Sequence, residues 1–479
     1  MQIPFVGGAY TAKSSNLNAQ SCINWYPEID PQNAKHPISL MPTPGLKEWH
    51  DTSLGNGYPI RKMLIVGEYL YAVVGKYLYK YDSNANSTII TGELDTDSGF
   101  VWMKSNGIDV VIVDPDKAGY VHVIGEGTFA KITTFDADFI VPSSLAYQDG
   151  YYIVSESGTD TIYISTALTG KEWDILEYAS GEAAPDDVEC VFSDQHQLWL
   201  LGEKTIEIWY NSGDLDFPFE RMSGGVIQRG IGAPASISSA DNSFYWIDDS
   251  GRACRMNGMS PVNVSTRHID YQFSKYTLSD AIGWTRIQEG HEFYEITFPT
   301  DDATWSYDAA TNLWHQKSSF PNLTSKKRHR GNCYANFNGK RLIGDYDNGK
   351  IYELDEETYK DDDQEIRRER RTQYVHNDRK RFFTHRLEVE FENGVGLDAD
   401  DADIGEGKDP QAMLKWSDDG GHSWSNEHQA SIGKIGETKN RCVFRRLGSS
   451  RERIYELSVT DPVKAVVLGA DANITAGIS

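Results

Sequence analysis

One motif in this sequence has the spacing of a side-chain cluster that could do chemistry. Residues 417–424 read S-D-D-G-G-H-S-W and match the Asp-box pattern S-x-D-x-G-x-[ST]-W. In that pattern Ser417 and Asp419 bond backbone amides of a tight turn, Gly421 takes a left-handed φ, and Trp424 packs back on the strand. We interpret the motif as a structural hairpin turn and not as a catalytic centre.

An acidic stretch is the second candidate, because clustered carboxylates can bind a divalent cation. Residues 398–406 place aspartates at 398, 400, 401 and 403 and a glutamate at 406. They lack the D-x-D-x-D-G spacing and the glutamate at the twelfth position that a calcium loop uses. We therefore expect a solvated acidic loop, and we expect Asp361, Asp362 and Asp363 to form an exposed turn.

A basic cluster is the third candidate, and three interpretations of it stay open. It could be a solvated strand face, a salt-bridged interface between subunits, or a contact with DNA phosphates. The cluster comprises Arg367, Arg368, Arg370, Arg371, Arg379, Lys380 and Arg381, followed by Arg386.

The usual signatures of catalysis and cofactor binding are absent from the sequence. There is no HxH or HExxH arrangement of histidines, no G-x-S-x-G elbow, no Walker loop and no G-x-G-x-x-G. The five cysteines are scattered without a CxxC pair, which predicts reduced buried thiols. We expect no metal, no cofactor and no catalytic residue.

The overall charge limits the partners of the protein. The 479 residues carry 46 Lys+Arg against 71 Asp+Glu, a formal net charge of -25. This argues against a general nucleic-acid clamp, which needs a basic surface, but it allows a negative wall along which DNA slides. The N-terminus lacks a secretory signal and no run of 18 apolar residues occurs, so no membrane insertion is predicted.

Strand patterns dominate and they repeat. Short apolar strands begin near residues 70, 110, 151, 198, 244, 293 and 341, each preceded by a turn and followed by a strand with an aromatic residue. A spacing of roughly 40 to 50 residues, repeated seven times, is typical of propeller blades. The sequence predicts an all-β protein with a β-propeller-like repeat domain of about seven blades; a large β-sandwich is the alternative.

Two further regions flank the repeats. Residues 1–55 contain five prolines between 27 and 44 and are expected to form an extended N-terminal arm, which either closes the propeller or docks on a neighbour. Residues 56–372 would be the propeller-like domain. Residues 373–479 alternate apolar and charged side chains and predict a C-terminal β-sandwich.

Three blocks of sequence, in this order, resemble the packaged-DNA stabilization protein family of short-tailed phages, the tail hub or nozzle proteins. The arm block is Ser21–Glu28 with Thr43–Leu46. The middle block is Leu198–Tyr210, Phe217–Arg221 and Gly230–Gly232. The tail block is Lys415–Trp424, Ile432–Glu437, Arg445–Gly448 and Thr460–Lys464. The resemblance covers nearly the whole chain, and segment 398–409 departs from it as a loop insertion.

The resemblance implies a virion protein, assembled in the host cytoplasm, that has a structural role. Members of the family form a homo-oligomeric ring of six below the portal-bound adaptor, or head-to-tail connector. The ring continues the DNA channel, helps to retain the packaged genome, and carries tailspikes, fibres or a needle. We therefore expect passive contact with genomic DNA in the channel.

An enzyme is the rival hypothesis, namely a propeller glycosidase or lectin that acts on host surface glycans. The Asp box, which occurs in sialidases away from their active centre, and the 12 Trp and 26 Tyr favour it. A sialidase also needs three arginines that grip a carboxylate and a Tyr–Glu nucleophile pair, and these cannot be placed here. We expect the protein not to be an enzyme.

Overall fold

The computed structural model describes residues 2–14, 18–30, 35–135, 140–214, 217–378, 380–398 and 406–477. It is an all-β protein, as predicted. The described residues contain one short helix, α1 (Arg267–Phe273), and one 3-10 turn, η1 (Pro234–Ser236). No helix in these segments is long and apolar enough to cross a membrane.

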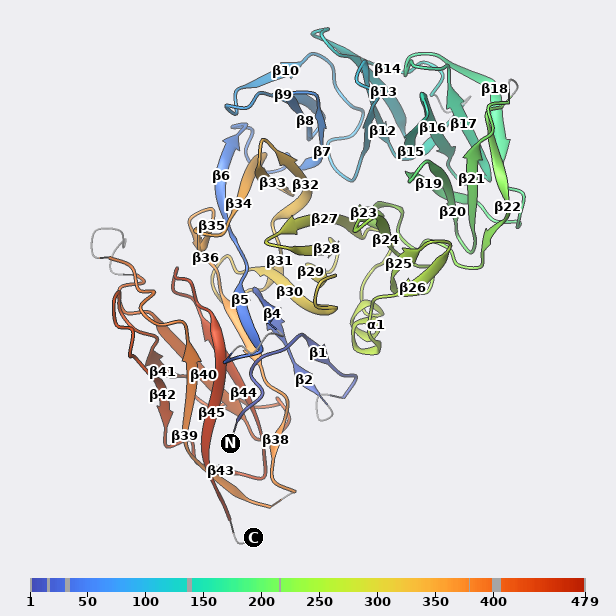
Figure 1. The fold of residues 1–479 in the computed structure, drawn as a ribbon. Coiled ribbons are helices and arrows are strands. Elements are labelled where there is room, and N and C mark those ends of the chain that lie inside the picture. Colours follow the sequence, from blue (N-terminus) through green and yellow to red (C-terminus); the bar gives the residue numbers. More distant parts are fainter. Residues whose placement is uncertain are drawn as a thin grey trace.

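Seven four-stranded antiparallel blades surround a common axis and form a propeller (Figure 1). The first five blades are separate sheets, and the last two are parts of larger sheets that contain further strands. Blade one contains β7 (Ile60–Val66), β8 (Tyr69–Val74), β9 (Tyr77–Tyr81) and β10 (Ser87–Ile90). Blade two contains β11 (Trp102–Ser105), β12 (Asp109–Asp114), β13 (Ala118–Val123) and β14 (Phe129–Lys131). Blade three contains β15 (Pro142–Gln148), β16 (Tyr151–Glu156), β17 (Thr161–Ser165) and β18 (Trp173–Ser180).

The remaining blades follow the same plan until the last. Blade four contains β19 (Val188–Asp194), β20 (Gln197–Gly202), β21 (Ile206–Asn211) and β22 (Phe219–Ile227). Blade five contains β23 (Ser238–Ala240), β24 (Ser243–Ile247), β25 (Ala253–Asn257) and β26 (Ser260–Asn263). Blade six contains β27 (Ile282–Gln288), β28 (His291–Phe298), β29 (Ala303–Asp308) and β30 (Leu313–Ser319), to which β31 (Lys327–Arg328) is added.

Blade seven is closed by a strand from the other end of the chain. It contains β32 (Gly331–Phe337), β33 (Lys340–Asp345) and β34 (Lys350–Asp355), and its outer strand is β6 (Gly45–Asp51) from the N-terminal arm. The arm therefore closes the propeller, which is one of the two roles expected for it. The first strands of most successive blades pack against one another, so they lie nearest the axis.

The packing of β12 explains why a single blade cannot stand alone. All six of its residues are buried. Val111 and Val113 belong to one apolar cluster, whereas Val110 and Ile112 belong to another that includes side chains of blade one. Alternate side chains of one strand thus pack on opposite faces of the sheet, and neighbouring blades cover both faces.

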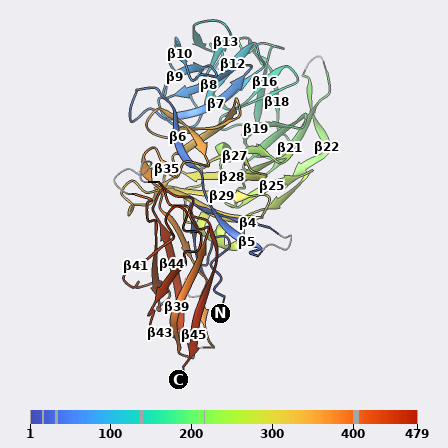
Figure 2. The same ribbon diagram turned by 60° about the vertical axis from the view of Figure 1, so that its left-hand side comes forward.

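The C-terminal region forms a β-sandwich of two sheets. Its first sheet contains β37 (Arg368–Arg371), β44 (Glu452–Val459), β40 (Gln411–Ser417) and β41 (His428–Ser431), with β38 (Val375–His376) beside β44. Its second contains β42 (Cys442–Arg445), β39 (Phe382–Phe391), β45 (Val467–Ala476) and β43 (Ser449–Ser450). Figure 2 shows these strands extending as a lobe away from the propeller.

The arm joins the two domains. Strand β3 (Cys22–Ile23) lies between β30 of blade six and β37 of the sandwich, so one sheet runs from the propeller into the sandwich. The hairpin of β4 (Trp25–Ile29) and β5 (Ile38–Pro42) extends the second sheet of the sandwich, because β5 pairs with β45. The short pair β1 (Tyr10–Thr11) and β2 (Ala19–Gln20) lies beside α1.

The predicted fold class is confirmed: a seven-bladed propeller, an extended arm and a C-terminal sandwich. The domain boundaries at residues 55 and 372 stay a prediction. Strands of the arm pair with strands of both the propeller and the sandwich.

Candidate functional site: the joint between propeller, arm and sandwich

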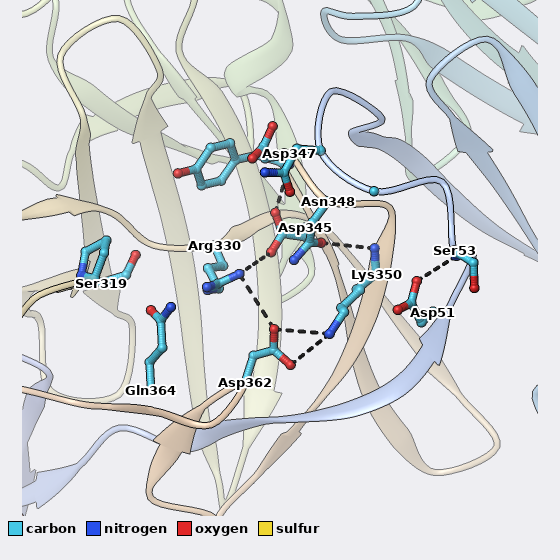
Figure 3. Close-up of a pocket in the computed structure, with 14 residues that line it drawn as sticks. Asp51, Ser53, Ser319, Arg330, Asp345, Asp347, Asn348, Lys350, Asp362 and Gln364 are labelled. Carbon is cyan, nitrogen blue, oxygen red and sulfur yellow. Dashed lines mark hydrogen bonds and ion pairs between the residues drawn. The ribbon is translucent and has the colours of Figure 1, made fainter.

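A polar pocket of about 630 Å³ opens where the closing strand β6 meets blade seven and the hairpin of β35 (Lys360–Asp361) and β36 (Gln364–Glu365) (Figure 3). We call this region the joint. The pocket is lined by Asp51, Ser53, Gly55, Asn56, Ser319, Pro321, Arg330, Asp345, Tyr346, Asp347, Asn348, Lys350, Asp362 and Gln364.

The charges of the pocket are paired with one another. The Arg330 guanidinium lies 3.1 Å from the Asp345 carboxylate and 4.0 Å from that of Asp362. The Lys350 ammonium lies 3.2 Å from Asp362, and the Tyr352 hydroxyl donates to Asp362 at 2.9 Å. Burial raises the pKa of Asp345, and the Arg330 charge opposes that rise. These contacts tie blade seven to the β35–β36 hairpin, as a structural clamp would.

Neighbouring aspartates in the β35–β36 hairpin lie in different environments. Asp362 and Asp363 have φ values of 49° and 64°, the left-handed conformation that aspartate tolerates in tight turns. Asp362 faces the pocket, but Asp361 is 5 % exposed. Burial raises the pKa of Asp361 to about 6, against the charges of Lys317, Arg330 and Arg368. The expectation of an exposed turn is therefore wrong for Asp361, because β35 pairs with β6 and lies inside the joint.

Arg370 of the basic cluster is fully buried. Its guanidinium donates to the carbonyl oxygens of Phe5, Gly8 and Ser21 at 2.7, 2.8 and 3.1 Å and to Gln20 Oε1 at 2.6 Å. Arginine suits this role because its planar fork offers five donors. Arg370 therefore fixes the N-terminal arm to the sandwich.

Arg368 is fully buried on the same face of β37 as Arg370. Its guanidinium carbon lies 5.8 Å from the centroid of the Tyr359 ring. Burial lowers the pKa of Arg368 to about 10, and the nearby Asp361 charge opposes that fall. Both arginine side chains are therefore enclosed within the chain.

The other members of the basic cluster lie nearer the surface. Arg371 is 2.8 Å from Glu456 and 3.4 Å from Glu369, and Arg367 pairs with the same two glutamates at 3.8 and 3.6 Å.

Past the end of β37 the chain is more exposed. Lys380 and Arg381 are exposed, whereas Arg379 lies outside the described residues. The interface and DNA-contact interpretations stay predictions, and Lys380 and Arg381 are the members best placed for either.

The Asp box forms the turn between β40 and β41. Ser417 Oγ accepts from the Gly421 amide at 2.8 Å, and the Asp419 carboxylate accepts from the Ser423 amide at 2.9 Å. Hydrogen bonds from Ser423 and Ser417 lower the pKa of Asp419 well below its ordinary value. Gly421 has a φ of 91°, and the Arg371 guanidinium lies 5.0 Å from the Trp424 ring centroid. Ser417, Asp419 and Ser423 thus bond to one another within the turn, whereas Asp418 pairs with Arg453 of β44 at 2.6 Å.

A histidine that the sequence analysis did not single out links the arm to blade six. His291 Nδ1 lies 2.8 Å from Asp308 of β29, and its Nε2 lies 2.6 Å from Glu28 of the arm strand β4. The bond to Asp308, assisted by Glu28, raises the pKa of His291 to about 9 against the effect of burial. The imidazolium bridges two carboxylates at neutral pH. No local pattern could reveal this bridge, because its partners are distant in sequence.

Within the described segments, no three His, Cys, Asp or Glu side chains gather as a metal site would require. Residues 399–405 of the predicted acidic loop lie outside the described residues.

The chain matches two family models that together cover almost its whole length. Residues 1–359 match the model described as "Bacteriophage P22 Gp10, beta-propeller", and residues 367–475 match "Bacteriophage P22 Gp10, beta-sandwich". A search of curated proteins found no match.

Solved propellers resemble part of the chain. The WD40 β-propeller domain of Doa1 has 11% identity and a TM-score of 0.41, and the match covers 64% of this chain and 97% of that chain. A virginiamycin B lyase from Staphylococcus aureus has 11% identity and a TM-score of 0.43, with 64% and 98% covered. The two family models match more of the chain than these structures do. On the evidence of the two family models, this protein belongs to the bacteriophage P22 Gp10 family.

Proposed function

We propose that this phage structural protein is the tail hub, or nozzle, which extends the DNA channel below the portal and its adaptor. In this proposal it forms a homo-oligomeric ring of six, retains the packaged genome, and carries tailspikes, fibres or a needle. Family membership supports a structural role in the virion.

The continuous sheet from blade six through β3 to β37 is the observation that carries the proposal. A sheet shared by two domains resists bending at their boundary better than a flexible linker would. The buried Arg370 and the His291 bridge add contacts between the arm and both domains. Such rigidity suits a part that must withstand the pressure of packaged DNA.

The charge of the protein fits passive contact with DNA. A net charge of -25 per chain would make a ring strongly negative, and a negative wall repels the phosphate backbone. We therefore expect acidic side chains to line the lumen of the assembled ring. A lumen lined mainly by Lys and Arg in a map of the assembled tail would refute this part of the proposal.

DNA retention in packaged heads tests the proposed function. Heads that have packaged DNA and carry portal and adaptor, but lack this protein, should lose their genome to added nuclease. Adding the purified full chain should keep the DNA protected, because in this proposal the assembled ring retains the genome in the head. An unrelated protein of similar size and net charge is the control. Equal loss of DNA with both proteins would contradict the proposal.

The same preparation addresses the glycosidase hypothesis. The purified chain should release no sugar from a panel of capsule and sialylated glycans. Robust release that one carboxylate substitution abolishes would favour the enzyme instead.

A further inference from the structure

The axis of the propeller holds two cavities of opposite electrostatic character. The larger, of about 1100 Å³, is lined by seven carboxylates and only two lysines. The smaller, of about 310 Å³, has no carboxylate among its lining residues. Phe100 and Ile282 line both cavities and so lie between them. We call the smaller one the axial cavity. In a chain with 71 acidic residues, a wall without any is a notable local exception.

Lys62 of β7 supplies a positive charge to the axial cavity. Its ammonium lies 4.7 Å from the centroid of the Phe100 ring. Among the described residues it has no ion pair and no hydrogen bond. Burial lowers the pKa of Lys62 to about 8, and the neighbouring Lys104 charge contributes to that fall. A cation that is partly desolvated and has no counter-ion is costly, so an anion beside it would be stabilised.

Lys104 adds a second unpaired cation near the axis. It belongs to β11 of blade two, yet its ammonium lies 5.7 Å from the ring of Phe192 on β19 of blade four. Its side chain thus reaches toward a blade that is not adjacent to its own. Burial lowers the pKa of Lys104 as well. Lys62 and Lys104, from two different blades, therefore lie close enough for the charge of Lys104 to act on Lys62.

Trp284 contributes an aromatic side chain to the wall of the axial cavity. It lines the axial cavity and is 5 % exposed, and its indole Nε1–H has no acceptor among the described residues. The indole stacks on Tyr334 with ring centroids 5.7 Å apart and planes 12° apart. The cavity thus combines a cation with aromatic side chains in its wall, whereas the Trp284 Nε1–H is enclosed by protein atoms.

We propose that the axial cavity binds a small organic anion, a flat carboxylate whose oxygens meet the Lys62 ammonium. The aromatic side chains would contact its apolar body. A volume of about 310 Å³ lies at the lower end of the range of small-molecule pockets. This site goes beyond the proposed structural role and does not depend on it.

The test compares three probes against the full chain by isothermal titration calorimetry at pH 7. Benzoate is the flat carboxylate, benzamidine is a cation of the same shape, and inorganic phosphate is an anion without an apolar body. We expect benzoate to bind at least tenfold more tightly than benzamidine or phosphate. Phosphate binding as tightly as benzoate would overturn the organic-anion proposal, and so would equal affinity for benzamidine.

Variants locate the site. Lys62→Met should weaken benzoate binding at least tenfold. Lys47→Met changes an exposed lysine on β6 and is the matched control, with no change expected. Benzoate binding that is unaffected by Lys62→Met would place the ligand elsewhere and overturn the proposal.

The pH dependence of the unmodified protein gives an independent readout. Because the Lys62 ammonium loses its proton near pH 8, benzoate affinity should fall about tenfold between pH 7 and pH 9. Constant affinity across that range would overturn the assignment of Lys62, whether or not its variants fold.

Discussion

Replacing Arg370 by methionine should lower the free energy of unfolding by about 3 kcal/mol and release the N-terminal arm. The guanidinium donates to the carbonyl oxygens of Phe5, Gly8 and Ser21, and methionine would leave those of Phe5 and Gly8 without this donor in a buried site. Urea unfolding followed by fluorescence measures the stability, and limited proteolysis of residues 1–21 measures arm release.

The exposed Arg381 provides the matched control for this substitution. Arg381→Met should leave stability within about 0.5 kcal/mol of the wild type, as surface substitutions usually do. If Arg370→Met were as stable as Arg381→Met but failed to assemble, the guanidinium would act at a subunit interface. That outcome would contradict the role assigned to Arg370.

Replacing Gly45 by alanine should destabilise the closure of the propeller. A Cβ at this position would lie 2.4 Å from the carbonyl oxygen of Thr358 and 2.5 Å from that of Lys360. Both atoms belong to the backbone, so β6 or the β35–β36 hairpin must move. We expect a loss of about 3 kcal/mol in the free energy of unfolding, the upper end of typical overpacking costs.

Hydrogen exchange shows where the closure fails. Amides of β34, which pairs with β6, should exchange faster in Gly45→Ala, while amides of β12 in blade two should change little. Lys47→Ala alters an exposed side chain on the same strand and should match the wild type. Unchanged exchange in β34 would mean that β6 does not hold the last blade in place.

The second strand of each blade was the part of the fold that sequence patterns predicted best. Strands such as β12 are covered on both faces by neighbouring blades, so nearly every residue is apolar and the pattern stands out. First strands carry a weaker pattern: β7 begins with Ile60, Arg61 and Lys62. Outer strands such as β18 are largely exposed, so their sequences are hard to distinguish from those of loops.

The site was predicted only in part. The Asp box could be recognised because the hydrogen bonds of Ser417 and Asp419 that shape its turn lie within eight residues. The burial of Arg370 and Asp361 could not be predicted in this way, because it depends on contacts with the arm, more than 300 residues away in the sequence. Charged side chains usually lie at the surface, so a sequence gives no local sign that a particular arginine or aspartate is enclosed.

Mass measurement of the protein mixed with a purified portal–adaptor assembly tests the central claim most directly. The tail-hub account predicts that six copies bind each portal–adaptor assembly as a ring, with no intermediate stoichiometry at saturation. A chain that stays monomeric and does not bind the assembly at any concentration tested would contradict it.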